Sequence, residues 1–310
     1  MFPTRDQVVS HLDRHAREDG IELRLSTTVD HIDARPAGWR LTTSGGDLDA
    51  RQVVVATGLQ HTPEVPDWPG KDAFTGELLH SSAYRNPMAY RDKRVLVVGP
   101  GSSGMEIAHD LATGGAAKVW LAVRTPPNIL LRGLPGGLPG VLIATPLYHA
   151  PTRIADAIAD RARLANLGDL TEFGLPVPAE GIFARNARLG QAPAIVDIDV
   201  IDAIKDGSIE IVGAVAAFDG AAVSLVDGTQ LEADVVICAT GYRTGLENMA
   251  GHLGVLDERG RPKATGEEPA RDGLRFLGYL ARPSQLGYVA KQSKRVAKRI
   301  ADELSASPSA

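Results

Sequence analysis

The sequence predicts an α/β fold made of two related units, each of which closes a parallel sheet. Two apolar segments support this prediction, because residues 53–58 and residues 235–241 both read as a buried strand that runs into Ala-Thr-Gly. Each segment follows a predicted helix and a set of short β-type runs in the same order. The second unit also opens with a strand, a glycine-rich turn and a helix over residues 94–112. Chance similarity between short valine-rich strands is the alternative, and the shared order makes it the weaker one.

Composition restricts the class of protein. The chain has 310 residues, of which 44% are hydrophobic and 23% charged, so it is globular with room for about two domains. The 33 lysines and arginines and the 38 aspartates and glutamates give a net charge of −5, which provides no electrostatic reason for a nucleic-acid partner. A single cysteine, Cys238, excludes an internal disulfide, a dithiol redox pair and a thiolate zinc site, and we expect no bound metal.

The chain shows no pattern of export or membrane insertion. Its first residues lack the apolar core of a signal peptide, and no run reaches the roughly eighteen uninterrupted apolar residues of a membrane-crossing helix. We therefore expect a cytoplasmic enzyme that acts on a small molecule, with neither a membrane nor a nucleic acid as partner.

The first unit is predicted to begin with a helix. Thr4 is the expected N-cap, Gln7 completes a capping box and Gly20 ends the helix. Its expected apolar face consists of Val8, Leu12 and Ala16. Three short strands of a small meander are expected over residues 21–25, 29–33 and 39–43. The apolar strand at residues 53–58 follows them and ends in a glycine turn.

The second unit repeats this order late in the chain. A helix is expected over residues 201–205. Short strands are then expected over residues 209–212, 215–219 and 223–226. The buried strand that follows continues into Ala239, Thr240 and Gly241, and Cys238 is expected to be a small buried apolar residue within it.

A glycine-rich turn gives the second unit a nucleotide-binding signature. A buried strand over residues 94–98 runs into Gly-Pro-Gly-Ser-Ser-Gly and then into a helical pattern. Gly99 permits the tight turn, Gly101 lets a pyrophosphate approach the backbone, and Gly104 brings helix and strand together. The helix N-terminus, with Ser102 and Ser103, supplies amide donors to the phosphates. The order of strand, turn and helix predicts a Rossmann-like dinucleotide site.

Arg124 favours NADPH over NADH. It ends the next predicted strand, which begins at Lys118, about twenty residues after the glycines. An NAD site places an acidic residue there to bind the ribose 2′-hydroxyl, whereas a 2′-phosphate needs a cation. Thr125 lies beside it. The alternative, which remains open, is an exposed arginine at a strand end that forms a surface ion pair.

The segment upstream of the glycine turn contains the pattern F-x-G-x-x-x-H-x-x-x-Y. Its four fixed positions are Phe74, Gly76, His80 and Tyr84. Taken alone, His80 is interpreted as a buried histidine with its hydrogen bonds satisfied. The whole pattern closely resembles the fingerprint of flavin-containing monooxygenases. The resemblance extends over nearly the whole chain and includes both Ala-Thr-Gly elements.

This resemblance implies that NADPH reduces FAD, and that the reduced flavin forms a C4a-hydroperoxide that oxygenates a small nucleophilic or carbonyl substrate. Gly99, Gly101, Gly104 and Arg124 are then expected to bind NADPH. The second Ala-Thr-Gly run is expected to lie near the nicotinamide end. The four fingerprint residues are expected to shape the junction between domains, and no residue is assigned a catalytic role.

The resemblance also implies a division into domains. Residues 1–88 are expected to be the first part of a truncated FAD-type domain, residues 89–241 the NADPH-binding Rossmann domain inserted into it, and residues 242–310 the returning part. The family binds FAD chiefly through an upstream Gly-x-Gly-x-x-Gly unit, and this chain contains no counterpart. The remaining FAD-side pieces are residues 1–60 and 273–279. Exposed apolar edges of this unit are expected to permit self-association.

An alternative function follows from the same observation. The chain is then a non-catalytic NADP(H)-binding module that has lost flavin binding. Elsewhere, residues 126–151 are interpreted as an apolar loop system, because prolines and glycines alternate there. A short helix is expected near residues 154–162, a terminal helix with a basic face around residues 291–304, and a disordered tail over residues 305–310.

Overall fold

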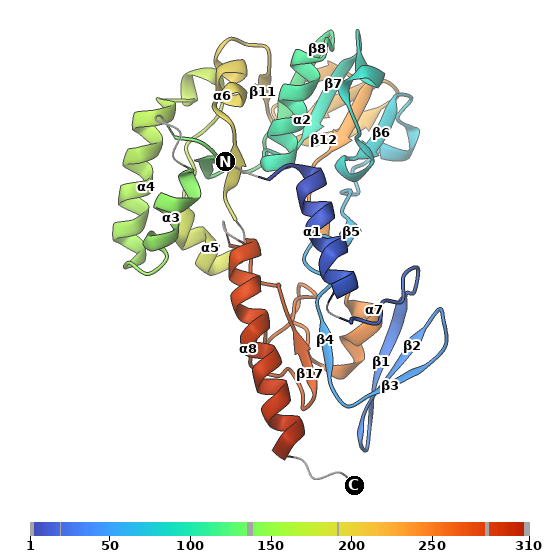
Figure 1. The fold of residues 1–310 in the computed structure, drawn as a ribbon. Helices are drawn as coiled ribbons and strands as arrows, with labels where there is room; N and C mark the ends of the chain where they lie inside the picture. The colour runs from blue at the N-terminus through green and yellow to red at the C-terminus, as the bar shows by residue number, and fades with distance from the viewer. Residues whose placement is uncertain (1–2, 19, 135–138, 191, 283–284, 307–310) are drawn as a thin grey trace.

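The computed structural model describes residues 3–18, 20–134, 139–190, 192–282 and 285–306. Its largest sheet has five parallel strands and lies at the upper right of Figure 1. Its strand order is β11-β8-β7-β15-β6. The strands span Glu210–Val212, Lys118–Ala122, Arg94–Val98, Val235–Cys238 and Glu77–His80. Four of them confirm strands expected from the sequence. The edge strand β6 is additional, and it lies in this sheet although it precedes residue 89.

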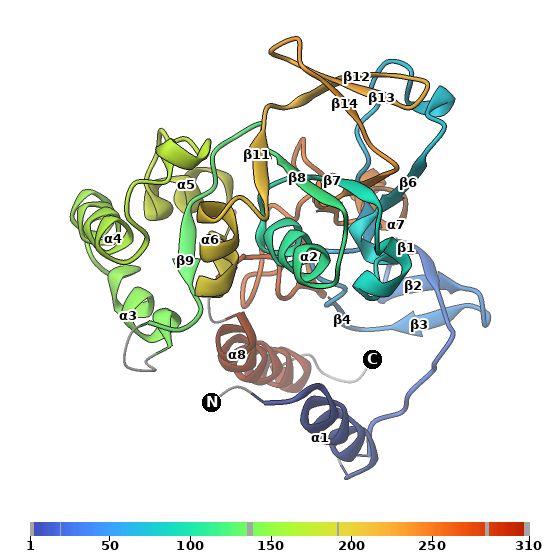
Figure 2. The ribbon, with the colours of Figure 1, turned by 90° about the horizontal axis from the view of Figure 1, so that it is seen from above.

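The two faces of the sheet bury alternate residues against different layers. Val97 and Ile237 pack under helices α2 (Ser102–Thr113) and α6 (Ile198–Lys205). Leu96 and Val236, which point the opposite way, pack against an antiparallel meander. The meander strands are β12 (Val215–Asp219), β13 (Ala222–Leu225) and β14 (Gln230–Glu232). Figure 2 shows the helices and the meander on opposite sides of the sheet.

The first unit contains a second meander and a two-stranded parallel pair. The meander strands are β1 (Val29–Arg35), β2 (Gly38–Thr43) and β3 (Leu48–Ala50). β4 (Val53–Val55) pairs in parallel with β17 (Leu274–Phe276), which joins the two ends of the chain. Ile32, Trp39 and Phe276 share one core with helix α7 (Glu247–Ala250). In the described residues the parallel sheet expected for this unit therefore consists of two strands.

The strand expected at residues 21–25 is wrong. The structure gives this segment no strand, and Ile21, Leu23 and Leu25 are 53%, 54% and 80% exposed. A strand needs a neighbour for its backbone hydrogen bonds, and none of the described strands lies beside this segment. The meander instead begins at β1 and gains β3, which the sequence did not indicate.

Helix α1 (Arg5–Glu18) confirms the predicted start but not the predicted packing. Thr4 and Gln7 form the reciprocal capping box, with Thr4 N to Gln7 Oε1 at 2.9 Å and Gln7 N to Thr4 Oγ1 at 3.3 Å. Val8 and Leu12 of the expected apolar face are exposed, by 38% and 62%. Local hydrogen bonds thus define this helix, while its apolar stripe lacks a partner among the described residues.

The loop system expected at residues 126–151 is more ordered than predicted, and regular elements continue from there to α6. The segment carries strand β9 (Ile129–Leu131) and helix α3 (Gly140–Leu147), which contains Pro146 in its last turn. Helix α4 (Thr152–Leu167) is longer than the short helix expected there. Helix α5 (Ile182–Leu189) and strand β10 (Ala194–Val196), parallel to β9, complete a helical lobe beside the sheet (Figure 1).

The remaining elements are short connections and the final helix. Strands β5 (Thr62–Pro63) and β16 (Tyr242–Arg243) pair antiparallel. Single 3-10 turns occur at Lys71–Ala73, Ser81–Ala83, Pro87–Tyr90, Thr171–Phe173 and Gly251–Leu253. The expected terminal helix is α8 (Gln285–Ala306), so the helix includes the first two residues of the expected tail, and residues 307–310 lie outside the described residues. No helix in the described part of the chain is both long and apolar enough to cross a membrane.

A buried arginine fixes α8 to the β4–β17 pair. The Arg275 side chain on β17 is fully buried, and its Nη2 donates to Glu303 Oε1 of α8 at 2.5 Å. Its Nη1 donates to Gln52 Oε1 at 3.0 Å and its Nε to the Glu267 carbonyl oxygen at 3.2 Å. Three acceptors from three segments therefore satisfy one buried cation.

We expect Glu303→Ala to destabilise the protein by about 3 kcal/mol, because it leaves the buried guanidinium of Arg275 without its carboxylate. Urea unfolding followed by circular dichroism measures the change. Arg299→Gln is the matched control, since Arg299 contacts the same carboxylate at 3.3 Å from an exposed position and should change stability by less than about 1 kcal/mol. Equal effects of the two substitutions would contradict this interpretation of the Arg275 contact.

Candidate nucleotide-binding site

The glycine turn lies where β7, α2 and the segment after β15 meet. Gly99 follows β7 with φ of +110°, and its N–H donates to the Ala122 carbonyl oxygen at 3.1 Å. A Cβ at Gly99 would lie 2.5 Å from the Ala239 carbonyl oxygen, and a Cβ at Gly104 would overlap the Gly99 carbonyl oxygen. Neither position accepts a larger residue without movement of the backbone. The roles expected for Gly99 and Gly104 thus have a geometric basis.

Gly101 leaves open space at the N-terminus of α2. It is the N-cap residue, with φ of −76° and ψ of 176°, and a Cβ there would have no protein atom within 4 Å. Ser103 is exposed beside it, while Ser102 Oγ accepts a hydrogen bond from Ile195 N at 2.8 Å. The free amides of the first helical turn therefore face an unobstructed approach, which suits an anionic group.

Arg124 and Thr125 lie exposed just after β8. The open alternative of a surface ion pair finds no support, because no described carboxylate lies within ion-pair distance of Arg124. The chain after them is held in place by Arg185, whose Nη1 donates to the Pro126 carbonyl oxygen at 2.9 Å. The Arg124 guanidinium is thus an exposed cation, without an ion-pair partner among the described residues, at the end of the strand next to the glycine turn.

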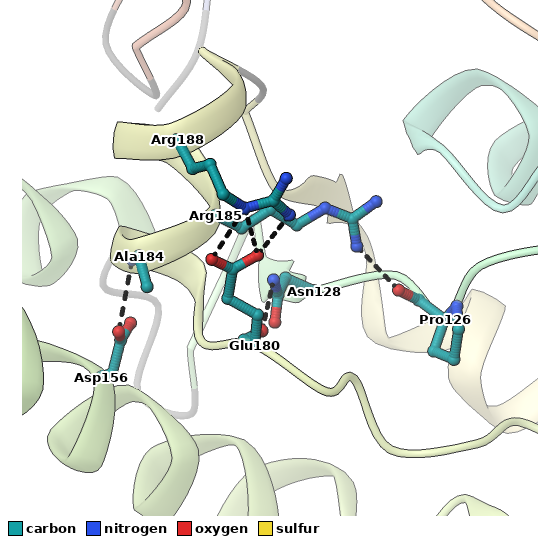
Figure 3. A network of polar contacts seen from close by, with 7 residues as sticks. All are labelled: Pro126, Asn128, Asp156, Glu180, Ala184, Arg185 and Arg188. Atoms are coloured by element: carbon teal, nitrogen blue, oxygen red, sulfur yellow. Dashed lines mark hydrogen bonds and ion pairs between the residues drawn. The ribbon is translucent and has the colours of Figure 1, made fainter.

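A polar network fixes this segment to the helical lobe, and Figure 3 shows its members. Asn128 Nδ2 donates to the Glu180 carbonyl oxygen at 3.1 Å, and Arg188 Nη2 donates to Glu180 Oε2 at 2.6 Å. The hydrogen bond from Arg188 lowers the pKa of Glu180. Asp156 of α4 accepts from Ala184 N at 3.2 Å, the bond drawn in Figure 3, and also from Phe183 N at 2.8 Å, and so caps α5. The network was not predicted from the sequence, because the contacts of Asn128 with Glu180 and of Arg185 with Pro126 join residues more than fifty positions apart.

The second Ala-Thr-Gly run crosses between the two units. Gly241 has φ of +95°, and its carbonyl oxygen accepts from Glu64 N at 3.0 Å. Thr240 Oγ1 donates to the Glu64 carbonyl oxygen. The Ala239 carbonyl oxygen is the atom that approaches Gly99. The run therefore touches both the glycine turn and the β5–β16 connection.

His80 links the fingerprint to this run. Its Nδ1 accepts from Ser82 N at 3.1 Å, so the ring proton is on Nε2, which donates to the Gly241 carbonyl oxygen at 3.0 Å. The ring also packs edge-on against Tyr242, with centroids 4.8 Å apart. His80 is 7% exposed. The buried, satisfied histidine expected from the sequence is confirmed.

The other fingerprint residues attach β6 to the nucleotide unit. Phe74 packs against Phe218 of β12, with ring centroids 5.1 Å apart, and a Cβ at Gly76 would lie 2.6 Å from the Phe74 ring. Tyr84 Oη donates to Asp110 Oδ2 of α2 at 2.6 Å. Burial and the Asp110 carboxylate both raise the pKa of Tyr84, so the phenol stays a proton donor. The fingerprint thus orients the helix that begins at the glycine turn.

The profile of the flavin-binding monooxygenase-like family matches residues 30–250. The chain belongs to this family. An indole-3-pyruvate monooxygenase of rice (Oryza sativa subsp. japonica), YUCCA1, is 34% identical over 288 residues, which cover 91% of this chain and 70% of that protein. A probable indole-3-pyruvate monooxygenase of Arabidopsis thaliana is 31% identical over 273 residues, covering 85% of this chain and 70% of that protein.

Two solved structures share the fold of this family member. The flavin-containing monooxygenase from Stenotrophomonas maltophilia superposes with a TM-score of 0.68 at 20% identity, over 96% of this chain and 77% of that one. The cyclohexanone monooxygenase from Rhodococcus sp. Phi1 bound to NADP⁺ gives 0.56 at 19% identity, over 76% of this chain and 55% of that one. Both support the expected pair of Rossmann-like units.

Membership in the flavin-binding monooxygenase-like family decides between the two expected functions. The protein is an oxidoreductase of the NADPH-dependent flavin monooxygenase type, with FAD and NADPH as its cofactors and a small molecule as its substrate. The non-catalytic NADP(H)-binding module is not favoured, because the relatives are monooxygenases.

The described residues fit the two cofactors unequally. The turn from Gly99 to Gly104 leaves no room for a side chain at Gly99 or Gly104 and leaves open space at Gly101, which fits the pyrophosphate of NADPH. On the flavin side, the 310 residues contain no second Gly-x-Gly-x-x-Gly turn. The β4–β17 pair and a Thr57 Oγ1 to Tyr279 Oη hydrogen bond of 2.8 Å remain there. The described residues thus provide a phosphate-binding turn for the nicotinamide cofactor, and no matching turn for FAD occurs in the 310 residues.

Cys238 has no role as a nucleophile. It is fully buried on β15, and burial raises the pKa of its thiol to about 12. The expectation of a small buried apolar residue is confirmed.

We expect Gly104→Ala to destabilise the protein by about 2 kcal/mol or more, because the new methyl group overlaps the Gly99 carbonyl. Thermal unfolding measures the effect. Gly101→Ala is the matched control, since φ is negative and the space is open there, and its stability should stay within about 1 kcal/mol of wild type. A Gly104→Ala protein as stable as wild type would show that helix and strand are not in close contact.

Proposed function

We propose that the turn from Gly99 to Gly104 binds the pyrophosphate of NADPH and that Arg124 with Thr125 binds its 2′-phosphate. The observation that supports this most directly is the exposed guanidinium of Arg124 at the end of β8, next to the glycine turn, for which the described residues provide no ion-pair partner. A cation without a protein partner is suited to an incoming phosphate dianion. An NAD site would place a carboxylate there instead.

Each residue of the proposed site has a distinct task. Gly101 leaves room for the pyrophosphate, and the amides around Ser102 and Ser103 donate to it along the axis of α2. Ala239 and Thr240, which lie next to Gly99 just after β15, border the nicotinamide end together with Gly241. FAD, when bound, takes the hydride and activates oxygen. The chain's own contribution is to hold the dinucleotide in one orientation toward that cofactor.

Arg124→Gln tests the cofactor proposal by comparing two nucleotides in fluorescence or calorimetric titrations. The NADPH dissociation constant should rise by about tenfold to a hundredfold, because a charge-assisted contact is lost, while that of NADH should change little. Arg153→Gln, at an exposed position on α4, should leave both constants unchanged. Equal weakening of NADPH and NADH would refute a 2′-phosphate role for Arg124.

We further propose a carbonyl substrate of the 2-oxo acid class. The support is the similarity to indole-3-pyruvate monooxygenases that are 31–34% identical over most of the chain. Indole-3-pyruvate should accelerate NADPH oxidation by the FAD-supplemented protein several-fold above its oxygen-only rate. Oxidation at the same rate with and without the acid, while a thioether accelerates it, would instead assign a soft nucleophile as substrate.

We propose bounds for the nucleotide unit, a cellular location for the protein and a surface for its self-association. We propose that the nucleotide unit begins before residue 77, because β6 belongs to its sheet. A cytoplasmic location suits an NADPH-dependent enzyme with one reduced cysteine.

Exposed Val8, Leu12 and Val54 support self-association through the first unit. Sedimentation velocity tests the last proposal, which a monomer at all concentrations would contradict.

A further inference from the structure

The helical lobe encloses a cavity of about 80 Å³ that the proposed function does not use. It lies among β9, α3, α4 and α5, the group of helices at the left of Figure 1. Its walls are mostly aliphatic and aromatic, and they include Leu130, Ala144, Leu147, Ile158 and Phe183. It shares no lining residue with the glycine turn or with Arg124. The cavity is therefore a separate feature of the lobe.

Two polar atoms in the wall of this cavity are buried without partners. Tyr148 Oη and Arg163 Nε are both inaccessible to solvent, and neither makes a hydrogen bond to the part of the chain that the structure describes. A buried polar group without a hydrogen-bond partner destabilises a fold. Two such groups in one cavity wall indicate a site that is completed by something other than the protein.

The charge on the cavity wall is positive, while the carboxylate of Asp169, which interacts electrostatically with Arg163, is not among the described lining residues. Arg163 is the only charged residue among the described lining residues. The guanidinium of Arg282 lies 5.0 Å from the centroid of the Tyr148 ring and adds a second positive charge nearby. Burial raises the pKa of the Tyr148 phenol, which keeps it a neutral donor. A carboxylate can accept from both the phenol and the guanidinium.

The size of the cavity limits the rest of the ligand. A dry cavity of about 150 Å³ accommodates benzene, so a cavity of about half that volume accommodates a few methylene groups. Apolar walls favour an alkyl chain over a polar one. We propose that this cavity binds a short-chain aliphatic carboxylate, with its carboxylate on Tyr148 and Arg163 and its alkyl chain among the leucines of β9 and α3.

The test uses butyrate as the probe on the full chain, with saturation-transfer NMR and isothermal titration calorimetry as readouts. Wild type should bind butyrate saturably at one site. 1-Butanol and butylamine, which keep the alkyl chain but lack the carboxylate, should bind at least tenfold more weakly. NADPH binding, measured in parallel, should not change when butyrate is added.

Three variants locate the site. Arg163→Met removes the cation but keeps an apolar stem, and Tyr148→Phe removes only the hydroxyl, so both should weaken butyrate binding, Arg163→Met by about tenfold or more. Ala159→Leu fills the cavity from α4 and should abolish binding. Arg161→Met is the matched control, because Arg161 is an exposed arginine on the same helix that does not line the cavity. Circular dichroism and NADPH affinity verify that each variant is folded.

Several outcomes would overturn the proposal. Absence of saturable butyrate binding to folded wild type would do so. Binding that survives Ala159→Leu and Arg163→Met unchanged would place the ligand elsewhere. Butylamine binding as tight as that of butyrate would exclude an anion site. The NADPH site is tested independently, because NADPH binding is measured with a different ligand and with variants of different residues.

Discussion

The close backbone contact between Gly104, Gly99 and Ala239 is the constraint on which the rest of the nucleotide unit depends. It places the first turn of α2 against the ends of β7 and β15, with atoms too close for any side chain at Gly104. This contact determines where the free amides of α2 point and which strand end lies beside them. The position of Arg124 at the end of β8 follows, because β8 pairs in register with β7.

The fingerprint residues extend this constraint to the rest of the molecule. His80 of β6 donates a hydrogen bond to the Gly241 carbonyl oxygen, and Tyr84, in the turn after β6, donates one to Asp110 on α2. Phe74 adds an apolar contact to the meander on the opposite face of the sheet. These contacts explain the spacing of the fingerprint without any acid or base chemistry. Its residues position the site through the backbone and are not expected to touch the substrate.

The sequence was most informative where structure is local. The capping box at Thr4 and the helix after Gly104 depend on residues within a few positions of one another. The strand before Gly99 was found from its uninterrupted apolar run, which is typical of a strand buried on both faces. The sequence failed where a distant partner decides the outcome: residues 21–25 have a strand-like pattern but no neighbouring strand, and β6 is a strand because β15 lies beside it. For the same reason Arg185 and Tyr148 were missed, since only the folded chain brings the Pro126 carbonyl and the lobe cavity to them.

The burial of Cys238 has a practical consequence. The only thiol of the protein lies on the central sheet between two hydrophobic layers, so a reagent such as iodoacetamide reaches it only when the sheet opens. Alkylation therefore reports the opening of this sheet, with one label per chain and no background from other cysteines. The alkylation rate of Cys238 therefore measures how often the core of the nucleotide unit opens.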